Sequence, residues 1–247
     1  MTDVIPNELV RNSIDVIEEK KPIKDAWQKS AVFMDSLITE LSERTDFSSL
    51  KDVDINYNLP FDEALEQYPK QAVAVIALNQ PTWAKTWAGC IDPESSLIVA
   101  RRSANRWGGQ TWAVPMGKVE AGDISTKNEA LGDVIGDAAE RELREETVRD
   151  QATNERSLIA SSFLDQKTGI LIHVVFKEIS EHRINKSSLS VGLPDTREHD
   201  QIGWIKMKDI TELTPMSEGV KFLFISALKY IKGINQQLTG NFPPLLG

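Results

Sequence analysis

The feature that most constrains this chain is a charged run that favours a helix, Arg141-Glu142-Leu143-Arg144-Glu145-Glu146-Thr147. On a helix, Glu142, Glu145 and Glu146 are related by i, i+3 and i+4, so their side chains project from one face. Three neighbouring carboxylates repel one another and weaken an isolated helix, unless a hard divalent cation lies among them. Because Mg²⁺ takes carboxylate oxygens and commonly binds substrate phosphates as well, the run predicts a magnesium site for phosphate chemistry.

A Glu-rich helix face is also a common solvated surface, and the run alone does not separate the two interpretations. The upstream segment does. A short apolar strand around Trp112 enters a Pro/Gly loop from Pro115 to Asp123, and the loop leads to the acidic helix. Together the two pieces resemble the Nudix hydrolase box, whose pattern is G-x5-E-x7-R-E-U-x-E-E-x-G-U, where U is a bulky aliphatic residue. The resemblance implies a Nudix-type α/β/α sandwich with a mixed sheet.

The box departs from the family pattern in its length. Between Gly117 and Arg141 there are 23 residues, where the pattern has 13, so the box carries about ten additional residues. Two acids compete for the position of the family's loop glutamate. Asp123 keeps the spacing from Gly117, and Asp133 keeps the seven residues before Arg141. We prefer Asp133, since Asp suits a helix start, and expect a loop insertion around residues 121–131.

The far end of the box departs as well. Val148-Arg149 stands where the family has glycine and an aliphatic residue. The glycine lets the chain leave the helix with a positive φ, which valine resists. We therefore expect the helix to run on or to end in a different turn.

The resemblance also implies roles for the residues of the box. Glu142, Glu145 and Glu146 would hold Mg²⁺, with Mn²⁺ as a substitute, together with a backbone carbonyl near Gly117. Glu145 and Glu146 are the catalytic candidates, one of which would take a proton from water. Arg141 is expected to point away from the carboxylate face and to pair with the loop acid, which pins the loop to the helix.

Residues outside the box provide further candidates. Glu198, in a late loop, is the candidate for an additional base or ligand, although an exposed loop glutamate is the simpler interpretation. Trp112 and Trp204 are expected in strands, where core packing is the common fate. The substrate-binding candidates are the cations Arg101, Arg102 and Lys118, each of which is otherwise a solvated charge, and Trp107 in a Gly loop, which could stack a base.

Composition narrows the class of protein. The chain has 247 residues, a net charge of −9 and a single cysteine. No apolar run approaches the roughly 20 residues that span a bilayer, so no membrane partner is expected. The acidic balance argues against binding nucleic acid through its phosphates. Cys90 excludes an intramolecular disulfide, is expected to be a packed thiol, and favours a reducing, cytoplasmic setting.

Hydrophobic periodicity predicts an α/β order of elements. We divide the chain into a helical N-terminal extension at 1–69, a Nudix hydrolase domain at 70–233 and a tail at 234–247. The expected helices cover 7–20, 25–44, 62–67, 133–147 and 217–232, and the expected strands cover 71–79, 96–102, 112–114, 157–164, 169–178 and 201–207.

The function that the resemblance implies is Mg²⁺-dependent hydrolysis of a nucleoside diphosphate linked to another group, with ADP-ribose or a nucleotide sugar favoured. A non-catalytic, nucleotide-binding or regulatory Nudix-fold module is the alternative. A prenyl diphosphate isomerase would need a catalytic cysteine, and Cys90 lies in no matching motif. Removal of the cap from capped RNA uses the same chemistry, and the net negative charge of the chain argues against this function. A homodimer through the N-terminal helices stays open.

Overall fold

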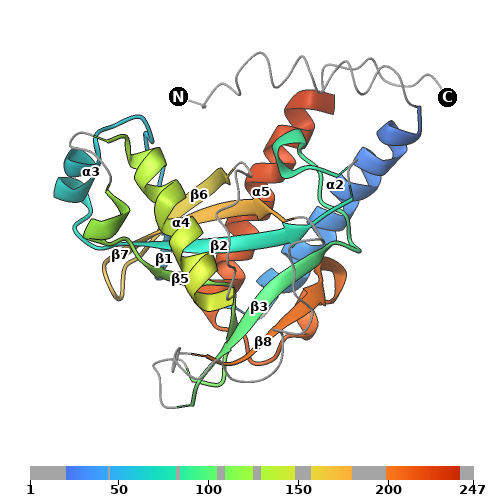
Figure 1. The fold of residues 1–247 in the computed structure, drawn as a ribbon. Helices are drawn as coiled ribbons and strands as arrows, with labels where there is room; N and C mark the ends of the chain where they lie inside the picture. The colour runs from blue at the N-terminus through green and yellow to red at the C-terminus, as the bar shows by residue number, and fades with distance from the viewer. Residues whose placement is uncertain are drawn as a thin grey trace.

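The computed structural model describes residues 21–43, 45–81, 84–104, 109–124, 129–147, 157–179 and 199–239. The strands and helices of these residues follow one another in the order shown in Figure 1: α2 (Lys21–Ser42), β1 (Leu50–Asp52), α3 (Phe61–Gln67), β2 (Gln71–Asn79), η1 (Thr86–Ala88), β3 (Ser96–Arg102), β4 (Trp112–Ala113), β5 (Met116–Lys118), η2 (Ala121–Asp123), α4 (Leu131–Thr147), β6 (Ser157–Asp165), β7 (Ile170–Glu178), β8 (His199–Lys206), η5 (Met207–Glu212) and α5 (Glu218–Thr239). The predicted helix over 7–20 lies outside the described residues.

The sheet is organised around β2, whose continuous apolar run was predicted as a buried strand with the same bounds. One edge of β2 pairs with β7 in parallel, and the remaining pairs are antiparallel, which confirms a mixed sheet. The other edge is shared, because β5 pairs with Ala72–Ala74 and β3 pairs with Leu78 and Asn79. The sheet therefore divides along β2, with β5 on one branch and β3, β4 and β8 on the other.

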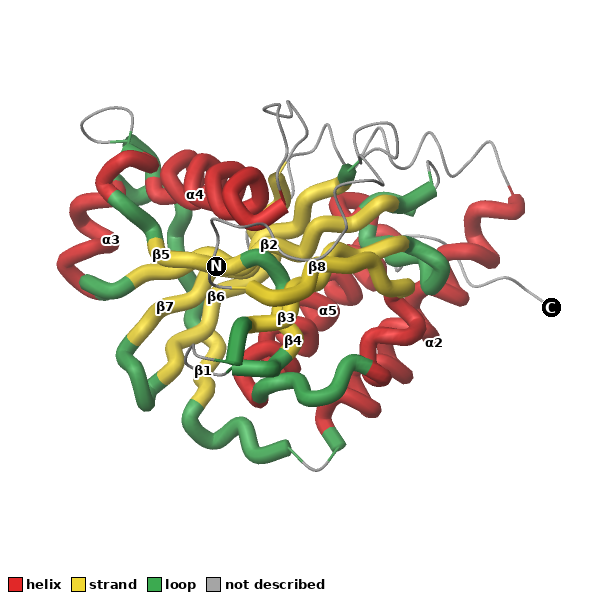
Figure 2. Tube along the Cα trace, turned by 60° about the horizontal axis from the view of Figure 1, so that its bottom comes forward, coloured by secondary structure: helices red, strands yellow, loops and turns green. Residues whose placement is uncertain are grey.

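Strict alternation along β2 supplies two hydrophobic layers. Its odd-numbered residues from Val73 to Ala77 belong to a core shared with α4, and its even-numbered residues from Ala74 to Leu78 belong to a core shared with α2 and α5. Figures 1 and 2 show α4 on one face of the sheet and the α2–α5 pair on the other. The predicted α/β/α sandwich is confirmed, with an N-terminal helix preceding it.

That N-terminal helix, α2, is predicted from its amphipathic stripe and packs against α5. Trp27, Met34 and Leu37 of α2 are buried in the shared core, and Asp35 forms an ion pair with Lys232 of α5. Two other elements differ from the expected organisation. The three-residue strand β1 joins the sheet beside β6, and α5 extends to Thr239 rather than ending near residue 232. The division of the chain at residues 69 and 233 stays a prediction.

One buried polar network lies within the sheet. The ring of His173 on β7 lies 2.9 Å from Gln71 Oε1 through Nε2, and 2.9 Å from the Tyr57 hydroxyl and 3.0 Å from Ser162 Oγ through Nδ1. Burial lowers the pKa of His173 to about 3, so the ring is neutral at physiological pH. The network joins β2, β6 and β7 to the segment before α3.

Two other expectations concern buried side chains. Cys90 is buried, and burial raises the pKa of its thiol, as expected of a packed thiol rather than a nucleophile. Trp112 and Trp204 pack against the two hydrophobic cores, as predicted for strand residues. None of the described helices is long and apolar enough to cross a membrane.

Candidate active site

Helix α4 carries the three glutamates that dominate the sequence. Glu142 and Glu146 lie one turn apart and are buried, with 7% and 4% of their surface exposed. The side chain of Glu145 is 56% exposed. The predicted single acidic face therefore divides into two carboxylates that lie between α4 and the sheet and one that reaches solvent.

The Glu142 carboxylate lies directly against the backbone of β5. A Cβ atom on Gly117 would stand 2.1 Å from Glu142 Oε1, closer than real Cβ atoms approach other atoms, so any other residue at this position would displace the Glu142 carboxylate. Burial raises the pKa of Glu142, and a hydrogen bond from Arg141 Nη1 to its Oε1, at 2.6 Å, partly opposes the rise. The charge on this carboxylate is stabilised only where a cation lies beside it.

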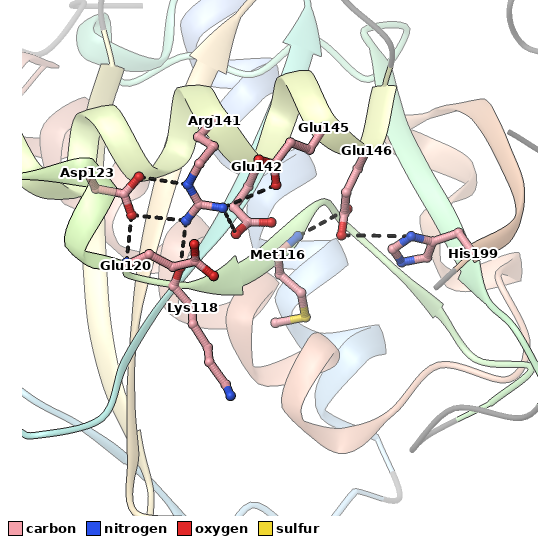
Figure 3. A network of polar contacts seen from close by, with 9 residues as sticks. All are labelled: Met116, Lys118, Glu120, Asp123, Arg141, Glu142, Glu145, Glu146 and His199. Atoms are coloured by element: carbon pink, nitrogen blue, oxygen red, sulfur yellow. Dashed lines mark hydrogen bonds and ion pairs between the residues drawn. The ribbon is translucent and has the colours of Figure 1, made fainter. Parts of the chain in front are cut away.

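Arg141 binds the loop that precedes α4. Its Nε and Nη2 donate to the two oxygens of Asp123 at 2.7 and 3.0 Å, and Nη2 also donates to the carbonyl of Lys118 at 2.7 Å. Asp123 is buried and accepts a further hydrogen bond from the Glu120 N–H at 2.7 Å. Such a two-pronged contact of guanidinium with carboxylate is among the strongest in proteins. Figure 3 shows how it fixes the loop to the helix.

The loop acid is thus Asp123, and the preference for Asp133 was wrong. Helix α4 begins at Leu131, so Asp133 lies inside its first turn, exposed, about 12 Å along the axis from Arg141. A position on the same rigid helix at that separation is out of reach of the guanidinium. The ten additional residues therefore lie between Asp123 and Arg141.

The expected orientation of Arg141 was also wrong. Its Nη1 donates to Glu142 Oε1 and, at 3.2 Å, to Glu145 Oε2, so the guanidinium lies beside two of the carboxylates instead of pointing away from them. The long side chain allows one guanidinium to reach the loop acid and the helix face together (Figure 3). Arg141 therefore partly neutralises the acidic face as well as holding the loop.

Glu146 is held from two other elements. Its Oε2 accepts a hydrogen bond from the Met116 N–H of β5 at 3.3 Å, and its Oε1 lies 3.8 Å from Nδ1 of His199 on β8. His199 is not among the residues that the sequence predicted for the site. The sequence does place His199 directly before the predicted strand at 201–207. It does not show on which face of the sheet the side chain lies.

The remaining site predictions are distributed around this centre. The Lys118 side chain is exposed and points away from the carboxylates, while its carbonyl serves Arg141 (Figure 3). Arg101 and Arg102 are half-buried on β3, and Arg102 lies opposite His199 in the sheet register. Three further sets of predicted residues lie outside the described part of the chain: Trp107, Glu198 and Val148-Arg149.

The donor set fits a hard divalent cation. Among the described residues, no three His, Cys, Asp or Glu side chains form a ready metal cluster. Mg²⁺ does not need one, because it usually takes one or two carboxylates and completes its shell with water and substrate phosphates. Glu142 and Glu146 are two buried carboxylates one turn apart, and Glu142 occupies the space that a Cβ on Gly117 would fill. These residues suit Mg²⁺ in kind and number.

Comparison with known proteins agrees with the box and the fold. The NUDIX domain family model matches residues 84–224, more than half of the chain. A mutT/nudix family protein from Listeria innocua is similar, with 19% sequence identity and a TM-score of 0.44 over 66% of this chain and 94% of that one. A NUDIX hydrolase from Alicyclobacillus acidocaldarius has 12% identity and a TM-score of 0.46, covering 70% and 96%.

A third similar structure is the NUDIX domain of NrtR from Shewanella oneidensis, solved in complex with ADP ribose, with 11% identity and a TM-score of 0.38 over 64% and 86% of the two chains. No curated protein matches the sequence. The family match covers the box, the three glutamates and most of the sheet. The chain belongs to the Nudix family of pyrophosphohydrolases.

Proposed function

We propose that this chain hydrolyses, with Mg²⁺, a phosphoanhydride bond in a nucleoside diphosphate linked to another group. The observation that carries the proposal is the pair of buried carboxylates, Glu142 and Glu146, set one turn apart beside the glycine of β5. Burying two carboxylates costs free energy unless positive charge offsets it, and the single charge of Arg141 is shared among Asp123, Glu142 and Glu145. ADP-ribose and nucleotide sugars are the substrates we favour.

Each residue of the box then has a task. Glu142 and Glu146 would hold the metal from the sheet side, and Glu145 would contribute from the solvent side. When bound, Mg²⁺ supplies Lewis acidity toward the diphosphate oxygens and toward water. The exposed carboxylate of Glu145 is the one that water reaches, so Glu145 is the proposed proton acceptor. Arg141 and Asp123 keep the loop and helix at a fixed separation.

The first experiment is a substrate panel with purified protein. ADP-ribose, nucleotide sugars, NADH, dinucleoside polyphosphates, nucleoside triphosphates and capped RNA would each be assayed with and without Mg²⁺ or Mn²⁺. We expect metal-dependent turnover of one class, reduced roughly a hundredfold or more in Glu146→Gln, because the variant lacks one of the two buried carboxylates that would hold the metal. Turnover that survives without metal, or in Glu146→Gln, would refute the proposal.

A second experiment separates the roles of the carboxylates. Glu142→Gln and Glu146→Gln should weaken Mn²⁺ binding, measured by the EPR signal of free Mn²⁺ in the absence of substrate. Glu145→Gln should lower kcat more than it lowers metal affinity, because its carboxylate is exposed and paired with Arg141 rather than buried. Equal losses of metal affinity in all three variants would show that Glu145 binds the metal as directly as Glu142 and Glu146 do.

The alternative function makes a different prediction. A nucleotide-binding module without catalysis would bind a compound of the panel and turn over none of them. The cytoplasmic setting stays a prediction, supported by a single buried cysteine. The homodimer stays open too, and a gel-filtration mass of one chain would exclude it.

A further inference from the structure

Strand β8 contains an irregularity next to the site. Arg101 of β3 lies opposite Gln201, whereas Arg102 lies opposite His199, so β8 carries one additional residue at this point. Such a β-bulge interrupts the alternation of side chains, and bulges beside active sites commonly redirect a side chain.

The consequence is visible in the faces that β8 presents. Ile202 and Trp204 pack against the core on the α4 side, and Ile205 packs against the core on the α5 side. Uninterrupted alternation would put His199 on the same face as Ile205. Instead, His199 faces α4, with Nδ1 3.8 Å from Glu146 Oε1. The bulge has turned His199 toward the catalytic helix.

The surroundings of Glu146 make this placement consequential. The side chains of His199 and Glu146 are 1% and 6% exposed, so their contact is shielded from bulk water. The opposite carboxylate oxygen, Oε2, accepts from the Met116 N–H. Figure 3 shows the Glu146 carboxylate between the backbone of β5 and the imidazole of β8. Two strands, one on each branch of the divided sheet, therefore bracket a single carboxylate.

We propose that His199 is a positioning residue, which holds the Glu146 carboxylate in the orientation that binds the metal. The inference rests on the proposed function, since it takes Glu146 as a metal ligand. The imidazole acts through Glu146 and need not touch substrate. Groups that orient a metal-binding side chain in this way typically contribute 10- to 100-fold in metal affinity.

The test uses two substitutions at one position. His199→Leu fills the buried space with no hydrogen-bonding group, and His199→Asn keeps an N–H near the place of Nδ1. Mn²⁺ affinity would be measured from the EPR signal of free Mn²⁺ without substrate. We expect a ~10- to 100-fold weaker affinity in His199→Leu and recovery of most of the loss in His199→Asn. At saturating metal, kcat should change less than the metal concentration that gives half-maximal activity.

A matched control is available on the same sheet. His173 is also buried, but its partners are Gln71, Tyr57 and Ser162, none of which belongs to the site. His173→Gln should lower the melting temperature and leave the Mn²⁺ affinity within twofold of the wild type. This control separates a general loss of packing from a loss of metal binding.

The outcomes distinguish this inference from the proposed function. If the wild type binds no Mn²⁺, or Glu146→Gln binds it as tightly as the wild type, the proposed function fails and the role of His199 fails with it. If Glu146→Gln weakens binding while His199→Leu does not, only the positioning role is overturned. Equal losses in His199→Leu and His199→Asn would also overturn it, because they would indicate packing rather than a polar contact. A gain in affinity in His199→Leu would show that His199 competes with the metal.

Discussion

Replacing Asp123 by asparagine tests the assignment of the loop acid most directly. The substitution keeps the shape of the side chain and removes its charge. From the described residues Asp123 accepts three hydrogen bonds: from Arg141 Nε to Oδ1, and from Arg141 Nη2 and the Glu120 N–H to Oδ2. An asparagine has one oxygen acceptor and an NH₂ group that must face a donor. With its oxygen at the Oδ2 position it keeps two of the three bonds and loses the one from Nε.

The size of the effect follows from this geometry. A hydrogen bond between charged groups contributes about 1.5–3 kcal/mol, and the lost bond joins a guanidinium to a buried carboxylate. The Arg141 side chain is 23% exposed, so it can recover part of the loss by turning to water. We expect Asp123→Asn to lower the free energy of unfolding by about 2 kcal/mol. For a chain of this size that corresponds to a melting temperature lower by about 4–8 °C.

Asp133→Asn is the matched control, since Asp133 is the other candidate for the same role. It is exposed in the first turn of α4, where a carboxylate interacts with the helix dipole for at most about 1 kcal/mol. Urea unfolding followed by tryptophan fluorescence would give the free energy of unfolding of both variants. Hydrolysis rates would show whether the loop that Asp123 fixes to α4 keeps its position. The reasoning is refuted if Asp133→Asn destabilises as much as Asp123→Asn, or if Asp123→Asn leaves stability and activity unchanged.

Three further substitutions test other parts of the structure. Gly117→Ala should lower metal-dependent activity by ~100-fold with little loss of stability, because its Cβ displaces the carboxylate packed against it; Gly122→Ala, with open space around the Cβ position, should be neutral in the same assays. Glu140→Gln should lower the free energy of unfolding by about 3–5 kcal/mol, because it leaves the buried ammonium of Lys177 without its carboxylate. Lys177→Met removes the buried charge itself and should lower the free energy of unfolding by less. A larger decrease in Lys177→Met than in Glu140→Gln, measured by urea unfolding, would contradict this. Burial lowers the pKa of His173 to about 3, whereas the unfolded residue titrates near 6.5. As the pH falls from 6.5 toward 3 the unfolded chain therefore binds a proton that the folded chain does not, and the folded state loses stability. Between pH 6.5 and 5 the free energy of unfolding of the wild type should fall by about 2 kcal/mol more than that of His173→Gln, and parallel pH profiles of the two proteins would refute this.

Local patterns predicted most of the fold and failed where pairing between strands decides. The apolar run of β2 and the amphipathic stripe of α2 identified both elements, because burial on a strand or helix follows a fixed period. β5 is Met-Gly-Lys, which has no such period. It is a strand only because residues 72–74 of β2 pair with it. Pairing between strands depends on residues far apart in the sequence, and the three residues of β5 do not by themselves predict it.

The same limit explains why the loop acid was misassigned and why His199 was missed. Spacing from Gly117 favours Asp123 and spacing to Arg141 favours Asp133, and the sequence does not show on which side of the acid the ten additional residues lie. The position where α4 begins decides, because it puts Asp133 inside the helix. His199 escaped notice for a related reason, since one bulged residue in β8 reverses the face on which it lies.

A more local signal for the two buried carboxylates was present in the sequence. The buried stripe of α4 consists of Leu131, Val134, Ile135, Ala138, Ala139 and Leu143. At 100° per residue Glu142 and Glu146 lie about 40° apart near the middle of this arc, whereas Glu145 lies within about 20° of its margin. A glutamate in the arc that burial reserves for apolar side chains needs a cation beside it. The position of Glu142 and Glu146 on this arc therefore argues for a metal site more strongly than the shared face of all three glutamates does.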